Sequence, residues 1–148
     1  MSGRSEHDEQ AALFRWAGFA RVRWPELAVM HAVPNGGHRR KATAGMLKAE
    51  GVRRGVPDIC LPVPRAGFHG LYIELKTRRG TATRDQRWWI EALRRLGYRA
   101  EICRGWEAAR AVIEDYLDGT AGAGDAGHPH LQPLQGGVKY GEQRAEHC

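Results

Sequence analysis

Two apolar runs rich in β-forming residues, 58–63 and 71–76, flank a short segment of turn-forming residues. This arrangement predicts two neighbouring strands joined by a turn-rich loop. Because side chains alternate along a strand, Glu74 and Lys76 share one face of the second strand. Asp58 opens the first strand, so a single hairpin can bring two carboxylates and one amine together.

Two acids beside one amine form a site suited to a divalent cation and a phosphodiester. Asp58 and Glu74, called the acid pair below, offer the oxygen ligands that Mg²⁺ and Mn²⁺ prefer, and the backbone carbonyl of Leu75 is a further candidate ligand. Without a cation the two carboxylates would repel each other, and one pKa would rise. Lys76 is a candidate to orient or deprotonate the attacking water, or to stabilise transition-state charge. The sequence does not separate those roles.

Capping signals and apolar periodicity predict the order helix, strand, helix, strand, strand, helix, strand, helix. Helices are expected at 5–20, 41–50, 83–96 and 106–117, and strands at 29–33, 58–63, 71–76 and 99–103. The last strand–helix–strand passage implies a right-handed crossover and therefore a mixed sheet. The expected class is α/β, with one three-layer domain in which helices flank a central mixed sheet.

Two polar residues on the predicted helices have both a local and a catalytic interpretation. Glu9 lies on the apolar stripe of the first helix, one turn before Leu13, and would complete the site if that helix packs across the sheet. As an acid near a helix start, it could instead only complement the helix dipole. Gln86 fits position N3 of a capping box begun by Thr83, yet it could also reach water or phosphate beside Lys76. For Gln86 we prefer the capping role.

Composition limits the partners and the compartment. A net charge of +6 favours a polyanionic partner. The three cysteines form no CxxC pair, and no apolar stretch is long enough to span a membrane, so we expect reduced thiols and a cytoplasmic protein. From Asp118 onward Gly, Ala, His, Pro and Gln dominate. We therefore expect a folded domain over 1–117 and a disordered tail over 118–148.

Basic residues flank the acids on both sides along the chain. Such residues contact phosphates, which gives affinity and salt dependence but no base specificity. Trp88 and Trp89 follow at the start of the next helix, where we expect packing rather than stacking on DNA. The predicted DNA-binding set consists of Arg39, Arg40, Lys41, Arg53, Arg54, Arg78, Arg79 and Arg84.

The chain closely resembles the VRR-NUC family of the PD-(D/E)xK nuclease superfamily in three motifs: PNGG at 34–37, VRRGVPD at 52–58 and ELK at 74–76. The resemblance spans about 5–117 and implies a restriction-endonuclease-like fold. It implies that Asp58 and Glu74 are metal ligands and that Lys76 is the catalytic lysine. By the same resemblance Glu9 is the helix-borne acid, and Gln86 matches a polar position after the motif.

The resemblance implies a DNA endonuclease that depends on Mg²⁺ or Mn²⁺ and selects Holliday junctions or other branched DNA. It also implies a homodimer of the small stand-alone kind often encoded by phages, which would act in the host cytoplasm. Two other interpretations stay open. The positive charge alone would fit a non-catalytic module that binds branched DNA. A restriction-type, sequence-specific nuclease would share the superfamily, although the short chain leaves little room for a separate recognition element.

Overall fold

The computed structural model describes residues 3–34 and 41–119, apart from the side chains of 41–43. The order of elements confirms the predicted α/β class and adds a short 3₁₀ helix, η1. No helix within the described ranges is long and apolar enough to cross a membrane. The expected tail lies outside these ranges from residue 120 onward, so the domain boundary stays a prediction. The elements are α1 (Glu6–Ala20), η1 (Pro25–Val29), β1 (His31–Ala32), α2 (Lys41–Ala49), β2 (Ile59–Leu61), β3 (Leu71–Lys76), α3 (Arg84–Arg95), β4 (Arg99–Arg104) and α4 (Trp106–Leu117).

The four strands form one mixed sheet in the order β1-β2-β3-β4. β2 pairs antiparallel with both β1 and β3, whereas β3 and β4 are parallel and joined through α3, as the crossover argument predicts. Within the hairpin, Ile59 lies opposite Ile73. Because antiparallel partners run in opposite directions, one further step places Asp58 opposite Glu74. The register therefore brings the acid pair together.

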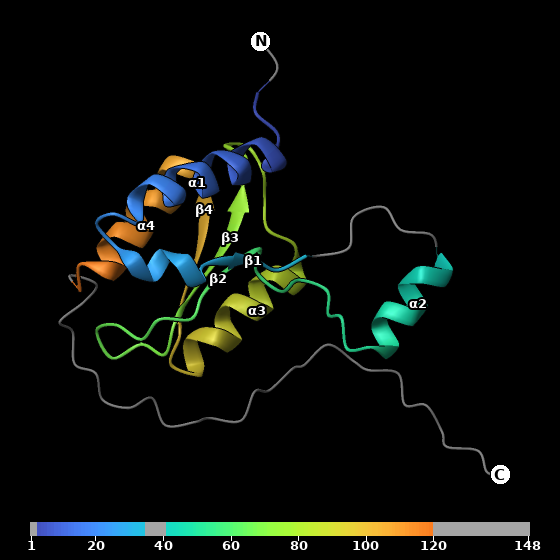
Figure 1. Ribbon diagram of the computed structural model, residues 1–148. Coiled ribbons are helices and arrows are strands. Elements are labelled where there is room, and N and C mark those ends of the chain that lie inside the picture. The colour runs from blue at the N-terminus through green and yellow to red at the C-terminus, as the bar shows by residue number, and fades with distance from the viewer. Residues whose placement is uncertain (1–2, 35–40, 120–148) are drawn as a thin grey trace.

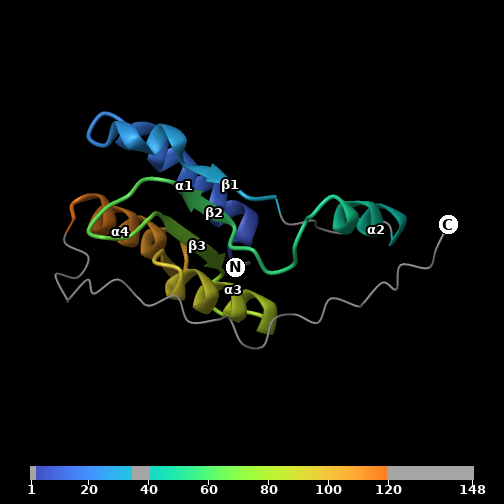
Figure 2. The same ribbon diagram turned by 90° about the horizontal axis from the view of Figure 1, so that it is seen from below.

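Helices cover both faces of the sheet and give the expected three layers (Figures 1 and 2). On one face, α1 and α4 pack over the β3 side chains Leu71, Ile73 and Leu75. On the other face α3 packs against β4 and forms a smaller apolar cluster with Tyr72 at its border. Helix α2 stands away from this body in both views. Glu74 and Lys76 belong to the α3 face, because side chains alternate along β3.

Two capping boxes fix where the helices beside the acid pair begin. The Ser5 hydroxyl accepts a hydrogen bond from the Asp8 amide at the start of α1, and Thr83 and Gln86 form the same arrangement at the start of α3. Gly97 ends α3 with a φ of 90°, and a Cβ there would lie 2.8 Å from the His69 ring. The beginning and the end of α3 are therefore both set by local sequence.

The buried Tyr116 hydroxyl donates a hydrogen bond to the backbone carbonyl of Val63. Tyr116→Phe leaves that carbonyl without its donor in the interior, so we expect the free energy of unfolding to fall by roughly 1–2 kcal/mol. Urea denaturation followed by circular dichroism measures the change. Tyr98→Phe, at a half-buried position, is the matched control. An unchanged urea midpoint for Tyr116→Phe would contradict the expectation.

Candidate active site at the end of strand β3

The acid pair lies where β2 begins and β3 ends. Glu74 is 1% exposed, and Asp58, just before β2, is half-buried. Asp58 Oδ2 accepts a hydrogen bond from the backbone amide of Leu75 at 2.9 Å. A side chain thus takes the place of a strand carbonyl at this point of the sheet. The hairpin brings the two carboxylates together as the sequence predicts, and Asp58 is fixed to β3 directly.

Burial and mutual repulsion control the protonation of the acid pair. Burial raises the pKa of Asp58. Burial and, next, the negative charge of Asp58 raise the pKa of Glu74 to about 7. Glu74 Oε2 is buried and finds no hydrogen-bond donor among the residues that the structure describes. Added positive charge at this oxygen would therefore stabilise the ionised pair.

The other oxygen of Glu74 receives two donors. Lys76 Nζ lies 3.2 Å from Glu74 Oε1, and Gln86 Nε2 donates to the same oxygen at 2.6 Å. Gln86 also caps α3, because its Oε1 accepts a hydrogen bond from the Thr83 amide at 2.8 Å. Gln86 therefore has the capping contact we preferred, and the other end of its amide contacts Glu74; a contact with water or phosphate stays a prediction. Helix α3 is tied through Gln86 to the buried acid.

Glu6 is an acid at the site that the sequence analysis missed. Its Oε1 lies 3.4 Å from Lys76 Nζ, and its side chain is half exposed. Burial lowers the pKa of Lys76, but the carboxylates of Glu74 and Glu6 outweigh burial and raise it above its ordinary value. The available signal was position, because Glu6 lies one helical turn before the inward-facing Glu9 and so shares its side of α1.

Glu9 faces inward as predicted and is 6% exposed, and its carboxylate contacts the start of α4. Its Oε2 accepts a hydrogen bond from the backbone amide of Trp106 at 2.8 Å. The N-cap residue of α4 is Gly105, which has no side chain to fill that role. The Glu9 carboxylate therefore supplies the N-terminal cap of α4, next to the strand end where Gly105 N–H donates to the Lys76 carbonyl. Its assignment as a metal ligand stays a prediction.

The donor set fits a hard divalent cation. Glu74 Oε2 lacks a partner within the described chain, and Asp58 lies opposite. In a strand the N–H and C=O of one residue point to the same side, so the Leu75 carbonyl faces the Asp58 side of β3. In the described ranges no three or more His, Cys, Asp and Glu side chains gather as a metal site. Two carboxylates and a carbonyl, with water completing the shell, suit Mg²⁺.

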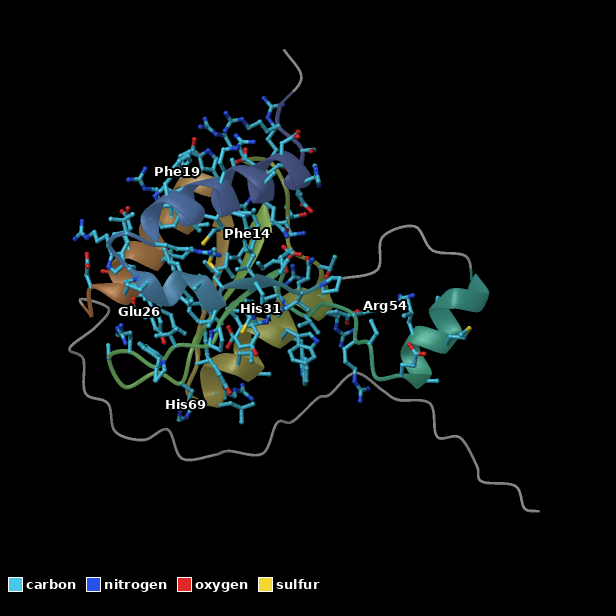
Figure 3. All side chains as sticks on the ribbon, in the orientation of Figure 1. Phe14, Phe19, Glu26, His31, Arg54 and His69 are labelled. Carbon is cyan, nitrogen blue, oxygen red and sulfur yellow. The ribbon has the colours of Figure 1, made fainter. Side chains whose placement is uncertain are left out.

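The predicted DNA-binding residues fall into two groups. Arg39, Arg40 and the side chain of Lys41 lie outside the described residues. The remaining five are exposed: Arg53, Arg54, Arg78, Arg79 and Arg84. Arg54 is labelled in Figure 3, on the segment that leads from α2 into the body. The described basic residues thus flank the acid pair along the chain, before β2 and after β3.

Comparisons with known proteins agree with this architecture. A family model of the VRR-NUC domain matches residues 7–107. A solved structure of a VRR_NUC domain protein superimposes with a TM-score of 0.70 and 28% sequence identity, over 80% of this chain and 93% of that chain. Formate–tetrahydrofolate ligase of Sinorhizobium medicae (strain WSM419) is 26% identical over 112 residues, which is 73% of this chain and 19% of that protein. The chain therefore spans about a fifth of the length of that curated relative.

With divalent cations removed by EDTA, the free energy of unfolding is expected to fall as the pH rises from about 4.5 to about 7. Folded Glu74 keeps its proton up to about pH 7, whereas the unfolded chain releases it near 4.5. The folded state then binds more protons across this range, so stability declines with pH. One pKa unit corresponds to about 1.4 kcal/mol, so the decline due to Glu74 is at most about 3–4 kcal/mol.

Urea unfolding at stepped pH measures this decline, and Glu74→Gln serves as the comparison. The variant lacks the titrating group and is expected to show a flatter profile. A decline just as steep in Glu74→Gln would show that the proton is held elsewhere.

Proposed function

This chain belongs to the VRR-NUC domain family, a nuclease-type family, and on that premise we propose that it is a divalent-metal-dependent DNA endonuclease. Nucleases of this family generally depend on a divalent metal. The observation that carries the proposal is the unpartnered Oε2 of buried Glu74, opposite Asp58 and on the carboxylate that Lys76 contacts. Such a pair is costly without added positive charge and is suited to phosphodiester hydrolysis with it.

Asp58, Glu74 and the Leu75 carbonyl would hold the cation, whose charge lowers the pKa of a bound water and offsets negative charge on a phosphate. The chain itself fixes the geometry of these ligands. The Leu75 amide orients Asp58 through one carboxylate oxygen. Gln86 and Lys76 occupy Glu74 Oε1, which leaves Oε2 as the ligating atom. The site is thus preorganised by hydrogen bonds to the oxygens that do not ligate.

Lys76 acts, in this proposal, as a charged donor rather than as a base. Its pKa lies above the ordinary value because Glu74 and Glu6 outweigh the effect of burial, so it is an ammonium at neutral pH. A general base needs a pKa near the working pH. An ammonium at the site instead donates hydrogen bonds to charge that develops on the phosphate oxygens. Of the roles left open by the sequence, transition-state stabilisation is therefore the one we propose.

For the substrate we propose branched DNA, cut by a homodimer. The exposed arginines on both sides of the acid pair suit phosphate contacts along a backbone. Two symmetry-related sites would suit a four-way junction, which has two-fold symmetry itself. Both parts of this proposal follow the family resemblance, and each has its own measurement.

The deciding assay incubates the purified protein with four-way, flap and linear duplex DNA in Mg²⁺, Mn²⁺ or EDTA. We expect cleavage of branched DNA with either cation and none in EDTA. Sedimentation velocity is expected to give twice the mass of one 16.5 kDa chain. Junction binding without metal-dependent turnover would favour the non-catalytic module. Discrete fragments from plasmid DNA would favour a sequence-specific nuclease.

Asp58→Asn and Glu74→Gln are each expected to lower kcat by at least about a hundredfold, because each removes a ligating charge. DNA binding measured without divalent cations is expected to persist, since the arginines remain. Glu91→Gln makes the same chemical change at an exposed position on α3 and is the matched control. Cleavage by Asp58→Asn or Glu74→Gln at the parental rate would refute the site.

Glu6 and Glu9, both on α1, are expected to respond oppositely when neutralised. Glu6→Gln removes a charge beside Lys76, so we expect kcat to fall several-fold with little change in stability, because Glu6 is half exposed. Glu9→Gln keeps an oxygen for the Trp106 amide but loses charge at a helix N-terminus. For it we expect about 1 kcal/mol less stability and near-parental kcat. A folded Glu9→Gln without activity would give Glu9 the ligand role predicted from the sequence.

A further inference from the structure

Residues 52–55, called the arginine turn below, end at Gly55, which lies against the first turn of α3. Gly55 has a φ of 84°, which side-chain-bearing residues rarely adopt. A Cβ at Gly55 would lie 2.6 Å from the carbonyl carbon of Asp85 and 2.8 Å from its Cβ. Only glycine permits this close approach. The backbone just after Arg54 is therefore seated on α3.

A second contact holds the turn from the side. The indole Nε1 of Trp89 donates a hydrogen bond to the backbone carbonyl of Arg54 at 2.9 Å. Trp89 is half-buried, packs against the apolar cluster under α3 and meets the Trp88 ring edge-on at 5.7 Å between centroids. The packing observed for Trp89 agrees with the packing role predicted for the tryptophan pair. The same ring also fixes the carbonyl of a residue 35 positions earlier.

The first two turns of α3 hold the arginine turn and the acid pair at once. Gln86 contacts Glu74, and three residues further along, Trp89 contacts Arg54. From Gly55 to Asp58 the chain can span at most about 11 Å. The side chain of Arg54 is exposed and lies at the outer edge of the body, toward α2 (Figure 3). A guanidinium is thereby presented at a limited distance from the acids.

We propose that Trp89 is a positioning residue for DNA binding: by holding the Arg54 carbonyl, it directs the Arg54 guanidinium to a backbone phosphate near the scissile one. The inference rests on the proposed nuclease function. A guanidinium pairs with phosphate through two parallel hydrogen bonds, so the strength of this contact depends on the orientation of the guanidinium. A backbone already fixed by Trp89 and Gly55 loses less conformational entropy when DNA binds. Trp89 itself acts through Arg54 and not on the reacting atoms.

The test is Trp89→Phe, which keeps an aromatic ring and removes the N–H donor together with part of the indole. Loss of one hydrogen bond predicts a roughly three- to tenfold rise in Kd for labelled four-way DNA in EDTA, and a similar rise in KM with Mg²⁺. We expect kcat to stay within about twofold, because the acid pair is untouched. The slope of log Kd against log salt concentration is expected to become shallower by about one, which corresponds to the loss of one phosphate contact. Trp88→Phe is the matched control and is expected to bind as the parent does.

A double-mutant cycle with Arg54→Ala separates positioning from a general effect on α3. If Trp89 acts through Arg54, then Trp89→Phe adds almost nothing to Kd in the Arg54→Ala background. Full additivity, or a parental Kd for Trp89→Phe alone, would overturn the inference. If Trp89→Phe does not fold, Gly55→Ala tests the same idea, because its Cβ displaces the turn from Asp85 and is expected to weaken binding similarly. Parental DNA binding by Gly55→Ala would equally overturn it.

Measurements on the parent protein separate the positioning role of Trp89 from the nuclease function on which it rests. A parent that neither binds nor cuts DNA would refute the proposed function. A parent that cuts branched DNA, while Trp89→Phe retains the parental Kd and KM, would refute only the positioning role.

Discussion

A carboxylate buried within a sheet is the constraint on which the rest of the site depends. Glu74 is 1% exposed and lies opposite a second acid, so its ionised form is costly unless positive charge is near. The neighbours offset only part of that cost. Lys76 and Gln86 satisfy one oxygen, and the other is left without a donor in the part of the chain that the structure describes. A fully satisfied carboxylate would have little affinity left for a cation, so the oxygen without a donor is the one that we propose as a cation ligand.

Two features of the fold, the hairpin register and helix α3, place the residues that surround Glu74. The register of the β2–β3 hairpin sets Asp58 opposite Glu74, and the parallel pairing of β3 with β4 requires a crossover connection, which contains α3. That helix, α3, begins with a capping box whose third residue, Gln86, also reaches the buried acid. Two turns of one helix therefore link its own start, the acid pair and the arginine turn. A small displacement of α3 would therefore change the contacts of Glu74 and of the Arg54 carbonyl together.

Features encoded within about twenty residues could be predicted from the sequence. The hairpin, the shared face of Glu74 and Lys76, and the Thr83 cap follow from alternation and local turn chemistry. Contacts between elements far apart in the sequence could not be predicted in this way. Glu6 and Glu9 have the same chemistry and nearly the same position on α1, and only the way α1 crosses the sheet sends one to Lys76 and the other to α4. The hydrogen bond from Trp89 to the Arg54 carbonyl could not be predicted for the same reason, because no local sequence signal indicates which carbonyl an indole N–H will contact.

The hydrogen bond between the Leu75 amide and Asp58 has a use beyond holding the site together. The chemical shift of an amide proton responds to the charge on its acceptor, and here the acceptor is a titrating carboxylate instead of a strand carbonyl. The Leu75 resonance in a nitrogen-edited spectrum is therefore an intrinsic indicator of the ionisation of Asp58. Ile73, two residues earlier, is paired with Ile59 in the regular ladder and has no side-chain acceptor of this kind, so it is a suitable comparison. Protein labelled uniformly with nitrogen-15 would thus report the ionisation of Asp58 in solution, with no nucleic acid present.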